Sequence, residues 1–187
     1  MDTPRQTDIL SPWVNADYFT ELSRERGSET HAICGKKARG IWVPSHELYQ
    51  GYIDSFTDWF KTMVEEALYV DGWAWDSLTK IWVHVGPLVS KVYNFHGTPD
   101  LIARHKGQIG LSIDDWKTAV TKQKVWELQV SGAYRILAEE NGYGPIGSCF
   151  SIRLDKDGGT AKAEEYGDLT DTKYFLDALG LYRYFNE

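Results

Sequence analysis

The hydrophobic residues of this chain change their spacing several times, from the period of a helix to that of a strand and back. The clearest helical pattern covers residues 49–67, where apolar side chains recur at i, i+3, i+4 and i+7. These side chains are Tyr49, Tyr52, Ile53, Phe56, Trp59, Phe60, Met63 and Ala67. Asp71-Gly72 is a typical stop after such a helix, and shorter runs typical of β-strands follow it at 80–85, 91–95, 99–104 and 109–116.

The rest of the chain completes an alternating order of elements. Asn15 is placed to cap a first helix over 16–39, and the helical period returns over 123–140 and again over 170–185. Two further strands are expected at 147–154 and 160–165. This order predicts an α/β or α+β fold in which helices flank a central sheet.

Length and cysteine content limit the kinds of site available. A chain of 187 residues suits a single domain, here expected to cover 1–187, and two cysteines cannot supply a disulfide framework, a four-thiolate zinc site or an iron–sulfur cluster. No apolar run approaches the roughly 20 residues of a membrane span, and the first residues lack a signal-peptide pattern. We therefore expect a protein of the cytoplasm that does not enter a membrane.

Two aspartates and a lysine form the most informative constellation. Asp100 opens one predicted strand and Asp115 lies near the end of its predicted hairpin partner, with Lys106-Gly107-Gln108 as the turn between them. Facing residues of such a pair lie about 5 Å apart, so the two carboxylates would converge on one hard cation. Lys117, two residues after Asp115, would share its face of the strand. Asp114 would point the other way.

The surrounding motifs give this constellation a family resemblance. Gly97-Thr98-Pro99-Asp100-Leu101-Ile102 and Ile113-Asp114-Asp115-Trp116-Lys117-Thr118 resemble motifs II and III of the PD-(D/E)XK nuclease superfamily. Gly27 and His31 resemble the G-x-x-x-H element of its RecB-like, phage-exonuclease branch, and the stretch around Gln129 resembles the helix that carries that branch's Gln motif. The resemblance implies a restriction-endonuclease-like core with a central mixed β-sheet flanked by helices.

The same resemblance implies a role for each matching residue. His31, Asp100, Asp115 and the backbone carbonyl of Trp116 would hold Mg²⁺ or Mn²⁺. Lys117 would position or activate the attacking water, and Gln129 would hold the active site or the DNA. That branch usually has Q-x-x-x-Y, whereas here the residue four after Gln129 is Ala133. Tyr134 lies about 140° from Gln129 on an α-helix, which makes it a secondary candidate.

These roles predict a metal-dependent deoxyribonuclease that hydrolyses phosphodiester bonds. The resemblance favours an exonuclease of recombination, repair or phage DNA metabolism, acting in a bacterial cytoplasm, with a recombinase or single-strand-annealing protein as a possible partner. The alternatives are a structure-specific endonuclease, a catalytically silent DNA-binding protein of the same fold, and an interaction domain in which the D-W-K sequence is accidental. Strand polarity, the number of metals and the oligomeric state stay open.

The net charge of −7 argues against a nucleic-acid-binding protein only when the chain is taken as a whole. Residues 24–39 hold five basic side chains against two acidic ones, and residues 101–125 hold the same balance. Both basic segments flank the proposed metal ligands, while the remainder of the chain is strongly acidic. We therefore expect DNA to contact this one face, with strong salt dependence.

Overall fold

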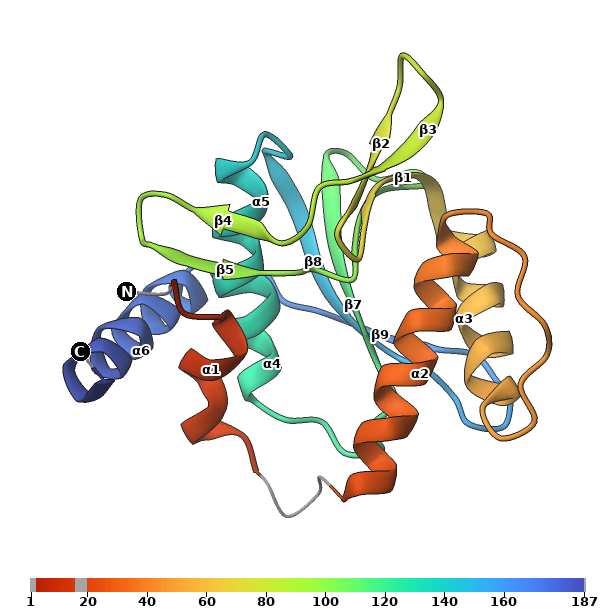
Figure 1. Ribbon diagram of the computed structural model, residues 1–187, viewed down its shortest axis with the longest axis horizontal. Coiled ribbons are helices and arrows are strands. Elements are labelled where there is room, and N and C mark those ends of the chain that lie inside the picture. Colours follow the sequence, from red (N-terminus) through yellow and green to blue (C-terminus); the bar gives the residue numbers. More distant parts are fainter. Residues whose placement is uncertain (1–2, 16–19, 187) are drawn as a thin grey trace.

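A seven-stranded mixed sheet forms the centre of the computed structural model, which describes residues 3–15 and 20–186 (Figure 1). Its strands lie in the order β3-β2-β1-β6-β7-β8-β9. They are β1 (Val64–Val70), β2 (Trp73–Asp76), β3 (Ile81–His84), β6 (Leu101–His105), β7 (Leu111–Lys117), β8 (Ile146–Arg153) and β9 (Lys162–Glu165). A separate small sheet pairs β4 (Leu88–Ser90) with β5 (Phe95–Gly97).

One parallel pair, β7 with β8, makes the sheet mixed, because every other pair is antiparallel. A parallel neighbour requires a crossover, and here a long helical segment supplies it. That segment consists of α4 (Val125–Glu127), the π-helix η3 (Leu128–Tyr134) and α5 (Arg135–Glu140). The predicted central mixed sheet flanked by helices is therefore confirmed.

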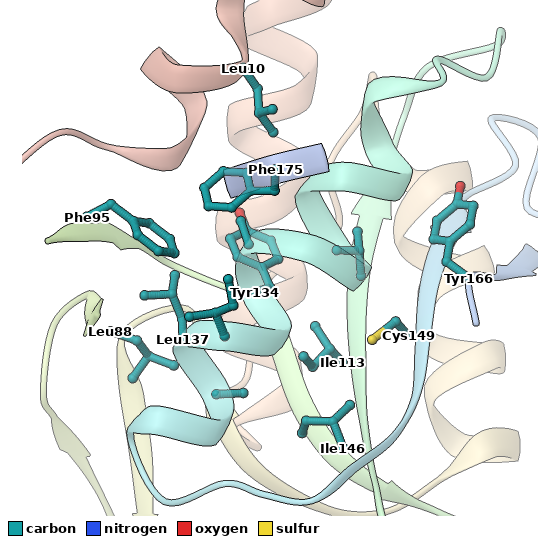
Figure 2. Packing of buried hydrophobic residues seen from close by; sticks show 14 of the residues in the cluster. Leu10, Leu88, Phe95, Ile113, Tyr134, Leu137, Ile146, Cys149, Tyr166 and Phe175 are labelled. Atoms are coloured by element: carbon teal, nitrogen blue, oxygen red, sulfur yellow. The ribbon is translucent and has the colours of Figure 1, made fainter. Parts of the chain in front are cut away.

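Helices cover both faces of the sheet and bury two apolar clusters (Figure 1). One face carries α2 (Glu21–Ala38) and α3 (Gln50–Met63), which pack around the buried Phe56 and Trp116. The other face carries α1 (Gln6–Leu10) with its 3₁₀ turn η1 (Ser11–Trp13), the crossover helices and α6 (Thr170–Asn186). Figure 2 shows the core on that face, where Phe95 from β5, Tyr134 from η3 and Phe175 from α6 come together.

Two predicted helix boundaries are wrong. The helix predicted over 49–67 ends at Met63, and Val64–Val70 instead forms β1, because its backbone pairs with β6 across the sheet. Ladder pairing with a distant strand thus overrides the local helical pattern. The helix predicted over 16–39 begins at Glu21, where Thr20 rather than Asn15 is the cap and its hydroxyl accepts the Ser23 N–H. Residues 16–19 lie outside the described residues.

The strand predicted at 91–95 is also wrong, since most of that stretch is a turn between β4 and β5. The Glu140 carboxylate accepts hydrogen bonds from the backbone N–H of Lys91, at 3.0 Å, and from the Ser90 hydroxyl, at 2.9 Å. These contacts, from a residue about fifty positions away, fix the turn. The other predicted strands and helices correspond to β3, β6, β7, β8, β9, the crossover helices and α6 within a few residues.

Candidate functional site

Of the two predicted acidic residues, Asp115 lies on β7 and Asp100 directly precedes the neighbouring strand β6. Leu101 on β6 pairs with Asp114 on β7, so the register continues to Asp100 beside Asp115. The backbone N–H of Trp116 donates to Asp100 Oδ2 at 2.8 Å, which fixes the Asp100 carboxylate against β7. Asp115 is 2% exposed, so its carboxylate is almost fully removed from water.

His31 joins this pair from α2. Its Nδ1 lies 3.1 Å from Asp100 Oδ1, and the imidazole is about one-third exposed. Burial lowers the pKa of His31, but the charge and hydrogen bond of the Asp100 carboxylate outweigh burial and raise that pKa overall. The structure thus brings together the histidine and the aspartate that the sequence places 69 residues apart.

Lys117 and Gln129 complete the constellation on the same face as Asp115. Lys117 Nζ forms an ion pair with Asp115 Oδ2 and donates to Gln129 Oε1 at 2.9 Å. Burial raises the pKa of the Asp115 carboxyl, Lys117 opposes that rise, and the neighbouring Asp100 adds to it. Gln129 Nε2 lies 3.5 Å from Asp115 Oδ1, so the amide bridges the acid and the base.

Asp114 points to the opposite face, as the two-residue period of a strand predicts. Its Oδ2 accepts hydrogen bonds from His105 Nε2, at 3.0 Å, and from the Ser112 hydroxyl, also at 3.0 Å. Both Asp114 and His105 are buried beneath α3. Asp114 is therefore part of the polar core, and Asp115 alone of this pair of neighbours faces the candidate site.

Tyr134 belongs to the site because the crossover segment is not a plain α-helix. Residues Leu128–Tyr134 form a π-helix, whose i→i+5 hydrogen bonds bring residues five apart onto one face. Gln129 Nε2 donates to the Tyr134 hydroxyl at 3.0 Å. The angle of 140° expected for an α-helix is therefore wrong here, because Gln129 and Tyr134 lie on one face of the segment and contact each other.

Close packing of α6 accompanies this wide turn. A Cβ on Gly132 would lie 2.8 Å from the backbone oxygen of Asp171 and 2.9 Å from Phe175 Cβ, so only glycine fits. The neighbouring Ser131 hydroxyl donates to the Asp171 carboxylate at 2.7 Å. The contacts of α6 therefore hold the segment that carries Gln129 and Tyr134.

Two residues near the site were missed from the sequence. Asp71, read only as a helix stop, adopts a positive φ of 46° and donates its backbone N–H to the Asp100 carbonyl at 3.1 Å. Burial and the Asp100 charge raise the pKa of the Asp71 carboxyl. Gln6, on α1, donates from Nε2 to the Tyr134 hydroxyl at 2.9 Å. The positive φ of Asp71 is visible only in the structure, so the sequence could not reveal it. Nothing in the sequence around Gln6 marks that residue either.

A cavity of about 730 Å³ opens beside His31 and Lys117. Its walls come from α1, the start of α2 and the segment that follows β7, and they carry the basic side chains Arg5, Arg24, Arg26 and Lys117. Among the described residues that line it there is no aspartate or glutamate. Within the described part of the chain, Arg5, Arg24 and Arg26 form no ion pair, so the cavity presents uncompensated positive charge.

The residues fit a hard divalent cation by their chemistry. Two carboxylates and an imidazole are a donor set suited to Mg²⁺ or Mn²⁺. However, over residues 3–15 and 20–186 no three His, Cys, Asp or Glu side chains already surround a common point as metal ligands would. His31 contacts Asp100 and Lys117 contacts Asp115, so a cation would have to replace these contacts. The role of the Trp116 carbonyl stays a prediction.

Comparison with known proteins adds no assignment. The chain matches no family model, and no curated protein sequence is significantly similar to it. Across the described residues no helix is long and apolar enough to cross a membrane.

Proposed function

We propose that this protein is a metal-dependent deoxyribonuclease with a restriction-endonuclease-like fold of the RecB-like, phage-exonuclease type. One observation carries the proposal: two aspartates, a histidine and a lysine lie together, and the histidine and the lysine line a cavity whose other charged side chains, among the residues that the structure describes, are all arginines. Carboxylates that hold a cation beside a basic groove suit the cleavage of a polyanion. The mixed sheet and its crossover helix support the same reading.

The side chains of the site divide into metal ligands and groups that manage the attacking water. Asp100, Asp115 and His31 would hold Mg²⁺ or Mn²⁺, which when bound supplies Lewis acidity and lowers the pKa of coordinated water. Lys117 would orient the water or stabilise charge on the scissile phosphate. Gln129 accepts a hydrogen bond from Lys117 and so fixes its ammonium group.

The basic lining supports DNA as the substrate despite the acidic total. Arg24 and Arg26 lie on the first turns of α2 and line the cavity, as does Lys117. Phosphate contacts from such residues would release counterions, so binding should weaken steeply with salt. The acidic remainder of the surface would restrict DNA to this groove.

Action from DNA ends rests on the resemblance to phage-type exonucleases and leaves a structure-specific endonuclease as the alternative. A comparison of linear with covalently closed circular DNA separates the two. A silent DNA-binding protein is the other alternative, and the presence of all four residues, His31, Asp100, Asp115 and Lys117, favours activity over it. A recombinase or annealing partner and a cytoplasmic location remain expectations of the same resemblance.

The test is cleavage of linear DNA by the full chain in Mn²⁺. Lys117→Met and Asp100→Asn should each lower kcat by at least about 100-fold, the usual contribution of a group that moves a proton or holds the reacting centre. Lys61→Met, on the exposed surface of α3, is the matched control and should behave as wild type. If neither site variant changes cleavage, the site assignment is wrong.

A further inference from the structure

The N-terminal segment reaches the interior of the candidate site through one side chain. Gln6 opens α1, is 2% exposed, and lies against Tyr134. The backbone just before it is tied to the small sheet, because His96 donates its N–H to the Pro4 carbonyl at 3.0 Å and Arg5 forms an isolated bridge with His96. Figure 2 shows Leu10, also from α1, directed at Phe175. The segment that carries Gln6 is therefore anchored before it by the small sheet and after it by Leu10 in the core.

Gly97 makes the approach of Gln6 possible. A Cβ at position 97 would lie 2.8 Å from Gln6 Cγ and 3.2 Å from the Tyr134 ring. The first distance is shorter than Cβ contacts in real proteins and the second is tight, so any larger residue would displace Gln6 and crowd Tyr134. Gly97, the last residue of β5, thus allows Gln6 and Tyr134 to pack together.

Hydrogen bonds connect Gln6 to the proposed catalytic lysine without a break. The Tyr134 hydroxyl accepts from Gln6 Nε2 at 2.9 Å and from Gln129 Nε2 at 3.0 Å. With Nε2 held by Tyr134, the Gln129 amide must turn Oε1 toward Lys117 Nζ, 2.9 Å away. An amide that rotated by half a turn would place its NH₂ group against the ammonium, which offers no acceptor.

We propose that Gln6 is a positioning residue, which sets the orientation of the Gln129 amide through Tyr134 and so holds Lys117 for reaction. The role of Lys117 in this statement rests on the proposed function, whereas the relay from Gln6 to Gln129 does not. The residues on either side of Gln6, Arg5 and Thr7, line the basic cavity. The segment that lines the basic cavity is thus the same one that would position Lys117.

Gln6→Met tests the relay, because methionine keeps the length and volume of the side chain and removes the amide. Gln108→Met makes the same chemical change in the exposed turn between β6 and β7 and is the matched control. The first measurement is the ¹H–¹⁵N spectrum of side-chain amides, in which the Gln129 pair is assigned by its loss in Gln129→Met. We expect Gln6→Met to shift the Gln129 resonances and Gln108→Met to leave them unchanged.

The second measurement is the kinetics of DNA cleavage in Mn²⁺. Gln6→Met should lower kcat about 5- to 10-fold, the equivalent of one hydrogen bond, with KM nearly unchanged and the thermal midpoint within a few degrees of wild type. Gly97→Ala, which reaches the same network from β5, should shift the same Gln129 resonances.

Unchanged Gln129 resonances in Gln6→Met would overturn the relay, and so would a rise in KM with kcat intact. A wild-type protein that never cleaves DNA would refute the proposed function instead. In that case the spectrum still decides whether Gln6 orients Gln129, so the two failures are distinguishable.

Discussion

Replacing Asp115 with asparagine should remove activity and at the same time stabilise the fold. Asp115 is 2% exposed, and burial raises the pKa of its carboxyl to about 6, from a usual value near 4. The folded chain therefore binds this proton more tightly than the unfolded chain does. Above pH 6 the folded state must hold an ionised carboxylate that it disfavours, so Asp115 costs the fold stability at neutral pH.

The size of the effect follows from that difference in pKa. Two units correspond to about 3 kcal/mol, a difference that already includes the attraction between Lys117 and the Asp115 carboxylate. We expect Asp115→Asn to raise the free energy of unfolding by about 1 to 3 kcal/mol at pH 8. The gain should shrink as the pH falls from about 6 towards 4. In that range the wild-type carboxyl becomes protonated in the folded state, so the cost of ionising it there disappears.

Urea unfolding at pH 8 and at pH 5, in EDTA, measures this gain, and cleavage of linear DNA in Mn²⁺ measures the loss of activity. Asp58→Asn, on the exposed side of α3, is the control and should change stability by less than about 0.5 kcal/mol. An Asp115→Asn protein that is less stable than wild type at pH 8, or that still cleaves DNA, would refute the reasoning.

Three further changes test the packing, the hydrogen-bond network and the groove. Gly132→Ala should destabilise the fold by about 1 to 3 kcal/mol in urea unfolding, because its Cβ would collide with α6, whereas Gly180→Ala, with open space around it, should be neutral or stabilising. Tyr134→Phe should lower kcat about tenfold, since two amide donors lose their acceptor; equal rates in the two proteins would exclude the network from catalysis. Arg24→Ala and Arg26→Ala should each weaken DNA binding and reduce the slope of log K against log salt by about one; an unchanged slope in a salt titration would place the DNA elsewhere.

The parts of the site that the sequence could predict depend on short-range rules. The two-residue period of a strand separates Asp115 and Lys117 from Asp114, and the turn at 106–108 brings Asp100 beside Asp115. The strand β1 could not be predicted in this way, because its residues continue the helical pattern of α3 and become a strand only by pairing with β6.

The remaining parts depend on contacts between distant segments. Gln129 and Tyr134 share a face only in a π-helix, and the close approach of α6 to Gly132 has no trace in the local pattern. Gln6 meets Tyr134 across 128 positions of the sequence, and a single glutamine in an N-terminal segment carries no signal of that meeting. The sequence therefore predicts the acidic, basic and histidine side chains of the candidate site more readily than the residues that hold them.

The most direct test of the account is the position of a divalent cation in crystals soaked in Mn²⁺, located by its anomalous scattering. We expect one peak within about 2.1 Å of carboxylate oxygens of both Asp100 and Asp115, with the His31 imidazole turned towards it, and we expect no such peak in Asp115→Asn. Manganese that binds only elsewhere on the protein, or a peak that survives in Asp115→Asn, would contradict the assignment of this site.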